Sequence, residues 1–301
     1  MTAEEAGSRL AIVAGGGPLP RRVIASCRQR GRSLVVVGFE GQTDAETVPA
    51  EPPHLWSRLG AAGALVDHLA DLSVQEICLV GTIRRPSLAE LRPDWKTAKL
   101  LGRIGLAASG DDAVLQAIGR VLAERGFRLV APQDLLDDLL APDAGALGRI
   151  EPDADARADI DRALAVARAM GALDVGQGAV VQQGIVLAVE AAEGTDAMLA
   201  RCAGLARPGP GGVLVKARKP QQDDRLDLPT IGTTTVEGAA AAGLRGIAVE
   251  AGGALIADAD AVRAAADRHG LFVVVLPAGE RASAAASAEP GNPGSFADTA
   301  P

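Results

Sequence analysis

Aromatic side chains are scarce in this sequence: they make up 2% of its 301 residues, and tyrosine is absent. Proteins that bind single-stranded nucleic acid stack its bases on such side chains. The formal net charge is −8, whereas nucleic-acid binders carry a basic surface. Both observations argue against a nucleic-acid partner, and the core must be built from aliphatic residues.

Cysteine and histidine are also rare, with three of each. The cysteines form no CxxC pair and the histidines lie far apart, so a zinc site is not expected. Three scattered cysteines are typical of a reducing cytoplasm rather than of a disulfide framework. No apolar run approaches the ~20 residues of a membrane-spanning helix, and the first one is too short for a signal peptide. The expected location is the cytoplasm.

What the chain does have is length and aliphatic content, enough for about two domains. In the first half, short aliphatic runs alternate with helical patterns, which is typical of a parallel α/β sheet. Strands are expected at residues 10–14, 34–39, 76–80 and 127–131, and helices at 21–30, 60–72 and 112–125.

The second half also mixes the two patterns, and a turn-rich stretch at about residues 143–153 marks the domain boundary. We expect an N-terminal domain over 8–146, a C-terminal domain over 150–280 and a disordered tail over 281–301. Expected helices cover 155–170, 196–205, 234–243 and 260–269, and expected strands cover 179–181, 185–190, 213–216, 247–250, 255–257 and 271–276.

Three consecutive glycines, Gly15, Gly16 and Gly17, follow the first expected strand and precede Pro18. Glycines there let backbone N–H groups approach an anion, and the helix that follows adds positive potential. The pattern is not GxGxxG, however, and no Walker lysine follows. A tight strand-to-helix turn and a contact with a phosphate therefore both stay open.

A second loop, residues 81–86, follows the third expected strand and contains two adjacent arginines. Ligands of α/β proteins bind beyond the carboxyl ends of parallel strands, and Arg85 could hold a phosphate there. A solvated basic loop is equally compatible with this pattern.

Three carboxylates, Glu190, Glu193 and Asp196, fall within seven residues. Such a cluster suits a hard divalent cation such as magnesium. Thr195 can instead serve as the N-cap of the helix that follows.

The densest group of charges lies in residues 219–232, with Lys216 just before them. Together they contain two lysines, one arginine and three aspartates, and prolines near both ends disfavour a helix. The cations suit phosphoryl oxygens, and the carboxylates suit a metal ion or a water nucleophile. The alternative is a solvated surface loop.

These motifs together resemble the LpxI family of UDP-2,3-diacylglucosamine pyrophosphatases. The resemblance covers about residues 10–276, and its most specific motifs are LDVGQGAVV (173–181), LAVEAAEGTDAML (187–199) and KPQQDDRLDLPTIG (219–232). It implies a Rossmann-like N-terminal domain and a C-terminal α/β domain, with the substrate between them. It also implies hydrolysis of the substrate pyrophosphate to UMP and 2,3-diacylglucosamine 1-phosphate with magnesium as cofactor, and Asp227 as the catalytic carboxylate.

The expected site follows from these motifs. The substrate contacts are expected to be Gly15, Gly16, Gly17, Pro18, Arg85, Gln177, Thr195, Asp196, Lys216, Lys219, Gln222, Arg225 and Thr230. The expected magnesium ligands are Asp227, Asp223, Glu190 and Glu193. The family also suggests a homodimer through the second domain. Because apolar loops would have to accommodate the acyl chains, peripheral contact with the inner membrane is expected.

Two other function classes stay in view. A non-catalytic nucleotide-sugar or lipid-binding protein on the same scaffold would keep the glycine loop without needing a metal. A nicotinamide-dependent oxidoreductase is disfavoured because GxGxxG is absent.

Overall fold

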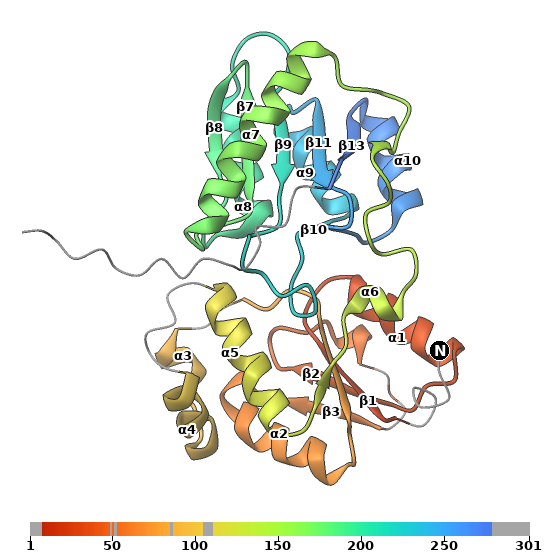
Figure 1. Ribbon diagram of the computed structural model, residues 1–301, viewed down its shortest axis with the longest axis vertical. Helices are drawn as coiled ribbons and strands as arrows, with labels where there is room; N and C mark the ends of the chain where they lie inside the picture. The colour runs from red at the N-terminus through yellow and green to blue at the C-terminus, as the bar shows by residue number, and fades with distance from the viewer. Residues whose placement is uncertain (1–7, 49, 51–52, 85–86, 105–110, 279–301) are drawn as a thin grey trace, which may run out of the picture.

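The computed structural model describes residues 8–48, 50, 53–84, 87–104 and 111–278. Figure 1 shows that they form two α/β domains, the N-terminal one below and the C-terminal one above. Arg85 and the tail expected over 281–301 lie outside the described residues. Within the described parts, no helix is both long and apolar enough to cross a bilayer.

The N-terminal domain is built on a parallel sheet with the strand order β3-β2-β1-β4-β5. Its central strands are aliphatic throughout because helices cover both faces. Leu10 and Ile12 of β1 pack in one core with α1, and Ala11 packs in the other core with α2 and α5. The strands are β1 (Leu10–Ala14), β2 (Leu34–Phe39), β3 (His54–Ser57), β4 (Glu76–Val80) and β5 (Arg128–Leu129). The α-helices are α1 (Leu19–Gln29), α2 (Ala62–Asp71), α3 (Leu88–Leu91), α4 (Trp95–Ile104), α5 (Asp111–Glu124) and α6 (Pro132–Leu135), with short 3₁₀ turns at Ala45–Thr47 and Leu59–Ala61.

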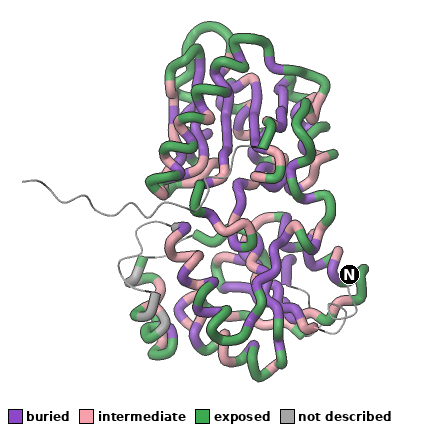
Figure 2. Tube along the Cα trace, in the orientation of Figure 1, coloured by how far each residue is buried: buried purple, intermediate pink, exposed green. Residues whose placement is uncertain are grey.

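The C-terminal domain is built on a mixed sheet with the order β6-β13-β11-β9-β7-β8. Helix α7 packs on one face through small residues such as Ala163 and Ala167, and α8, α9 and α10 cover the other face. The strands are β6 (Gly145–Ala146), β7 (Gly178–Gln182), β8 (Ile185–Val189), β9 (Val213–Lys216), β11 (Gly246–Glu250) and β13 (Phe272–Leu276), and β10 (Thr230–Ile231) pairs separately with β12 (Leu255–Ile256). The helices are α7 (Ala154–Ala172), α8 (Gly194–Cys202), α9 (Thr233–Ala241) and α10 (Ala259–His269), with a 3₁₀ turn at Ala203–Leu205. In Figure 2 the buried parts of the trace follow the strands of both sheets.

The two domains share apolar cores. Residues 217–229, which follow β9 and are called the 217–229 loop here, extend from the C-terminal domain toward the N-terminal one. Leu226 of this loop packs in the core that contains α2 and α5, and Leu228 packs in the core that contains α1. The segment that connects the domains is hydrogen-bonded to the C-terminal domain, because the N–H of Ile256 in β12 donates to the Leu139 carbonyl at 2.7 Å. The 217–229 loop is therefore part of both domains.

The structure confirms the α/β prediction and the predicted strands at 10–14, 34–39, 76–80 and 213–216. Strand β3 and helices α3 and α4 were not predicted. The N-cap role expected for Thr195 is wrong: α8 begins one residue earlier, at Gly194, and the Thr195 hydroxyl donates to the Glu190 side chain at 2.8 Å. Thr195 therefore connects the end of β8 to α8 instead of capping the helix.

Candidate active site

The ends of three strands in the C-terminal sheet bring the predicted polar residues together. Strand β9 ends at Lys216, which pairs in register with Gly178, the first residue of β7. Gln177 therefore lies beside the start of the 217–229 loop, and its carbonyl accepts from the Ala217 N–H at 2.9 Å. Glu190 follows β8, and its N–H donates to the Gly178 carbonyl. Lys216, Gln177 and Glu190 thus lie at one edge of the sheet.

The 217–229 loop lies against the N-terminal domain and is not a solvated surface loop. Side-chain amides of that domain donate to its backbone: Gln116 Nε2 to the Gln221 carbonyl at 2.7 Å and Gln133 Nε2 to the Asp224 carbonyl at 2.9 Å. Lys216 and Lys219 are 5% and 6% exposed. Both lysines are therefore buried, and the alternative of a solvated surface loop is wrong.

Asp227 lies half-buried within this loop, held by a buried glutamine. Gln222 Nε2 donates to Asp227 Oδ2 at 2.9 Å and to Gln177 Oε1 at 3.4 Å, while Gln222 Oε1 accepts from the Lys219 N–H at 3.1 Å. Both ends of the Gln222 amide are used, which fixes its rotamer and the carboxylate that it holds.

The pKa of Asp227 lies above the usual value for an aspartate, chiefly because burial disfavours its charged form. Lys216 and Lys219 oppose the shift and Asp112 adds to it. A carboxylate whose pKa is raised by burial, with two ammonium groups nearby, is a candidate general base.

The two lysines differ in their partners. Lys219 Nζ lies 2.6 Å from Asp174 Oδ1, in a largely buried ion pair. Lys216 Nζ donates to the Thr230 carbonyl at 3.2 Å, and within the described part of the chain it forms no ion pair. A buried ammonium without a contacting carboxylate can bind an anionic ligand without first breaking an ion pair.

Two carboxylates that the sequence analysis left out complete the site. Asp112, at the start of α5, is 3% exposed and accepts from Gln116 Nε2 at 2.7 Å. Burial raises the pKa of Asp112, and the Asp174 and Asp223 carboxylates raise it further. Asp174 has a left-handed backbone, with φ of 54°, and its Oδ2 lies 3.4 Å from the Ala113 N–H in the first turn of α5. The available signals were the acidic pair Asp111 and Asp112 and the LDVGQG motif (173–178), in which only Gln177 had been given a site role.

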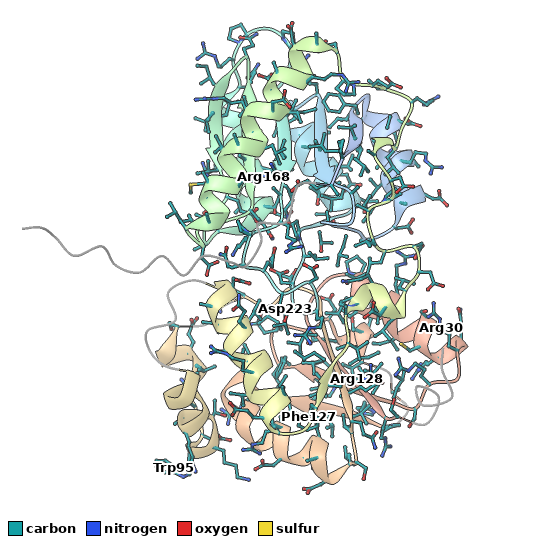
Figure 3. All side chains as sticks on the ribbon, in the orientation of Figure 1. Arg30, Trp95, Phe127, Arg128, Arg168 and Asp223 are labelled. Carbon is teal, nitrogen blue, oxygen red and sulfur yellow. The ribbon has the colours of Figure 1, made fainter. Side chains whose placement is uncertain are left out.

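Three other acidic residues predicted for the site are either paired with arginines or exposed to solvent. Glu193 pairs with Arg201 at 2.8 Å on the surface, and Asp223 makes two hydrogen bonds to the Arg225 guanidinium, the shorter of them 2.7 Å. Both ion pairs lower the pKa of the carboxylate involved. Asp196 is exposed. No three Asp, Glu, His or Cys side chains among the described residues are placed to hold a metal ion together. Figure 3 shows Asp223 between the two domains.

The glycine loop forms a tight junction between two strand ends. The Gly15 N–H donates to the Val80 carbonyl and the Gly16 N–H to the Thr82 carbonyl, both at 2.8 Å, and the Gly17 N–H donates to Asp44 Oδ2 at 3.0 Å. A Cβ at Gly15 would lie 2.6 Å from the Thr82 oxygen. These three N–H groups are therefore bonded within the protein. The structure agrees with the tight-turn interpretation, and exposed Pro18 follows the turn.

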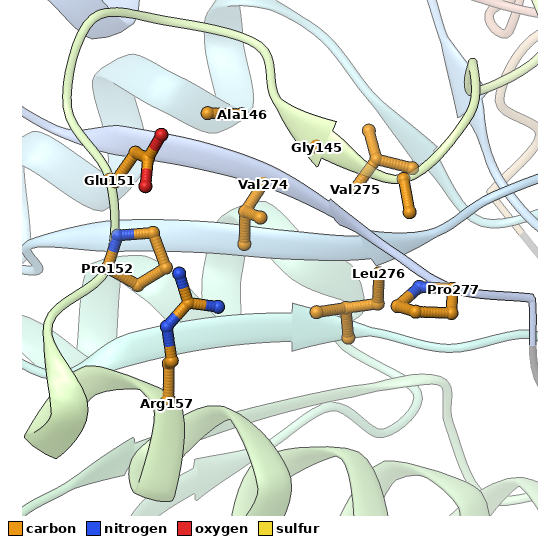
Figure 4. Close-up of a pocket in the computed structure, with 10 residues that line it drawn as sticks. Gly145, Ala146, Glu151, Pro152, Arg157, Val274, Val275, Leu276 and Pro277 are labelled. Atoms are coloured by element: carbon orange, nitrogen blue, oxygen red, sulfur yellow. The ribbon is translucent and has the colours of Figure 1, made fainter.

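Two shallow hollows lie away from these residues, in the C-terminal domain. One, of about 270 Å³, lies beside β6 and β13 and is lined by Glu151, Arg157 and Val274 among others (Figure 4). The other, of about 320 Å³, lies around Asp159 and Arg245. Neither is lined by the site residues described above.

Comparisons with known proteins agree with this architecture. Residues 9–139 match the family model described as the LpxI N-terminal domain, and residues 143–274 match the LpxI C-terminal domain. A protein of Caulobacter vibrioides named UDP-2,3-diacylglucosamine pyrophosphatase LpxI is 41% identical over 280 residues, which cover 91% of this chain and 99% of that protein.

Two crystal structures of the Bordetella bronchiseptica enzyme WbmG give a much weaker likeness. The complex with NAD aligns at a TM-score of 0.28 with 14% identity over 42% of this chain and 37% of WbmG. The complex with NAD and UDP aligns at 0.27 with 15% identity over 40% and 34%. At these scores the likeness says nothing about the function of this chain.

Proposed function

Because the chain belongs to the LpxI family, we propose that it is a hydrolase that cleaves the pyrophosphate bond of UDP-2,3-diacylglucosamine. In this proposal water attacks the α-phosphorus, and the products are UMP and 2,3-diacylglucosamine 1-phosphate for lipid A biosynthesis. The observation that carries it is the position of Asp227, held by Gln222 and close to Lys216 and Lys219.

Each residue of this group has a chemical task. Pyrophosphate repels an attacking nucleophile by its negative charge, and Lys216 and Lys219 offset that charge on the phosphoryl oxygens. Asp227 accepts a proton from the attacking water, whose oxygen bonds to the α-phosphorus. The bond from that phosphorus to the bridging oxygen breaks, and the sugar 1-phosphate leaves with that oxygen. Gln222 and Gln177 keep the Asp227 carboxylate aimed at the water.

Magnesium fits this site in a restricted way. The four ligands expected from the sequence do not converge, because Asp223 and Glu193 are paired with arginines and Glu190 is bonded to Thr195. The Asp112 carboxylate is close enough to Asp227 to raise its pKa. These two carboxylates fit a cation that takes its other ligands from substrate phosphates and water. When bound there, magnesium would supply positive charge to the phosphoryl oxygens.

The remaining expectations belong to the same proposal. Thr195, Asp196, Arg225 and Thr230 of the C-terminal domain are proposed to contact substrate. Pro18 and the glycine loop of the other domain are proposed to do the same, the loop through atoms other than its bonded N–H groups. The proposed enzyme works in the cytoplasm as a homodimer, in peripheral contact with the inner face of the inner membrane.

The test is release of UMP from UDP-2,3-diacylglucosamine, with magnesium and with a chelator. We expect equimolar UMP and 2,3-diacylglucosamine 1-phosphate, with the rate lowered by chelation. Substrate that is bound but stays intact would favour the non-catalytic binding protein and contradict the proposal.

A further inference from the structure

Positive charge is concentrated in one short part of the N-terminal domain. Residues 84–103 hold six basic and two acidic side chains, a net charge of +4 in a chain whose formal net charge is −8. The rest of the chain is therefore strongly acidic. The charge of this segment is therefore opposite in sign to that of the whole chain, and its described basic side chains are Arg84, Arg92, Lys96 and Lys99.

Helix α4 lies within this segment and packs on the domain without forming part of its cores. Thr97 is buried, and its hydroxyl accepts from the Gly63 N–H of α2 at 2.9 Å. A Cβ at Gly63 would lie 2.6 Å from the Lys96 carbonyl carbon, so the two helices are in close contact. No described side chain of α4 belongs to either apolar core of the domain. The helix therefore adds surface to the domain instead of covering the sheet.

The outer face of α4 is exposed along its length. Trp95, Ala98, Lys99 and Gly102, spaced i, i+3, i+4 and i+7, are all exposed. Trp95 is 82% exposed, more than any other large apolar side chain that the structure describes, and Figure 3 shows it at the periphery of the molecule.

The charges around this face are partly unpaired. Lys96 is bonded to Asp67 at 2.6 Å, and Arg84 is bonded to Glu90 at 3.2 Å. Lys99 and Arg92 are exposed and, among the residues that the structure describes, form no ion pair. Exposed tryptophan beside unpaired cations is the combination that partitions into the headgroup region of an anionic bilayer.

A second apolar feature lies on the same flank. In Figure 1, α3, α4 and the C-terminal end of α7 are on one side of the molecule, next to α5, whose first turn supplies Asp112 to the site. Leu173 and Val175, directly after α7, are 74% and 42% exposed. Exposed apolar side chains therefore follow α7 directly, at the end of that helix that Figure 1 draws toward α5.

We propose that the outer face of α4, with Trp95 inserted and Lys99 at the headgroups, docks this protein on an anionic lipid bilayer. The docking itself needs no catalytic activity. Its purpose, to bring the active site to a substrate with two acyl chains, rests on the proposed function. The net acidic chain would be repelled by such a membrane in other orientations, so this face also sets the orientation.

Tryptophan fluorescence tests the surface directly, because the chain holds two tryptophans. Trp56→Phe leaves Trp95 as the single reporter. With vesicles of phosphatidylglycerol and phosphatidylcholine we expect a blue shift of its emission and quenching by brominated acyl chains. Vesicles of phosphatidylcholine alone should give a much smaller change.

Co-sedimentation with the same vesicles supplies the matched comparison. Lys99→Gln should weaken binding about fivefold, the effect of one basic residue near an anionic surface. Trp95→Ala should weaken it at least as much. Arg162→Gln makes the same charge change at an exposed position of α7 and should leave binding unchanged. Circular dichroism would verify that each variant is folded.

Three results would overturn the docking proposal: no binding to anionic vesicles, binding without a change at Trp95, or equal binding by Lys99→Gln and Arg162→Gln. Binding of another protein at Trp95, with no binding to anionic vesicles, would be the first of these results. The hydrolysis assay separates this proposal from the proposed function. Both α4 variants should cleave detergent-dispersed substrate at the parent rate and vesicle-embedded substrate more slowly.

Discussion

At the scale of single residues, Asp227 is placed where two opposing influences meet. Burial raises its pKa, and Lys216 and Lys219 pull the pKa down, with burial the larger effect. Folding therefore disfavours the ionised carboxylate relative to the unfolded chain. A protein keeps such a group when the charge is needed for chemistry.

The first prediction concerns stability and pH. Since the pKa of Asp227 is raised by folding, its ionised form costs stability at pH values above the folded pKa. The cost vanishes as the pH falls to the ordinary aspartate range. Asp227→Asn should therefore raise the thermal midpoint at about pH 7 and change it little at about pH 3. A midpoint lowered at neutral pH would contradict this reading of the carboxylate.

The second prediction compares the two lysines, using detergent-dispersed substrate. Lys216→Met removes a buried ammonium that forms no ion pair in the described residues, so kcat/KM should fall by ~10²-fold without loss of stability. Lys219→Met leaves Asp174 buried without its cation, so it should also destabilise the fold by about 3 kcal/mol. The free energy of unfolding of each variant would be measured by chemical denaturation. Equal values for the two variants would contradict a stabilising role of the Lys219–Asp174 ion pair.

At the scale of elements, the glycine loop connects the ends of β1 and β4 through main-chain contacts. The third prediction is that Gly15→Ala destabilises the protein by about 1–3 kcal/mol, because its Cβ would overlap the Thr82 carbonyl. Gly102→Ala is the matched control: nothing lies within 4 Å of its Cβ, and alanine should stabilise α4 by up to about 1 kcal/mol. Thermal denaturation of both variants tests whether close packing at Gly15 is required. A Gly15→Ala variant as stable as the parent would contradict this prediction.

How far the sequence predicts the elements depends on their local signals. Strands β1, β2 and β4 were placed correctly because each is an aliphatic run that ends at a glycine or a turn. Strand β3 is four residues long and lacks that pattern, and its pairing with β2 provides its order. Helix α4 was missed because lysines interrupt its apolar residues and it packs on another helix rather than on a sheet.

The site was partly predictable for a related reason. The 217–229 loop carries its charges in one continuous segment, so Lys219, Gln222 and Asp227 could be named together. Asp112 and Asp174 are distant in sequence from this loop. Asp174 meets it through the ion pair with Lys219 within the C-terminal domain, and Asp112 meets it through the packing of α5 against that domain. The expected carboxylate cluster at 190–196 failed as a group, because one side chain turns inward to Thr195 and another outward to Arg201.

At the scale of the whole molecule, the 217–229 loop links the two domains mechanically. Leu226 packs against Gly119 and Leu129 of the N-terminal domain, and Leu228 packs in its other core. The catalytic Asp227 of the proposed function lies between these two anchors. Its position therefore depends on both domains being folded and docked.

The fourth prediction follows from that arrangement. The two domains should unfold in one cooperative transition in denaturant, and Leu226→Ala should lower the stability of the whole protein by about 2–4 kcal/mol. Two separate transitions, with the C-terminal one unchanged in Leu226→Ala, would show that the loop does not couple the domains.

The central claim is that Asp227 activates water for hydrolysis of the pyrophosphate, and the most direct test is single-turnover release of UMP in ¹⁸O-labelled water. The parent protein should place the label in UMP. Asp227→Asn should be slower by ~10³-fold, which corresponds to about 4 kcal/mol of transition-state stabilisation, while it still binds the intact substrate. Asp155→Asn, which changes an exposed carboxylate at the start of α7, should match the parent. A folded Asp227→Asn protein that released UMP at near the parent rate, or label found in the sugar 1-phosphate, would contradict the claim.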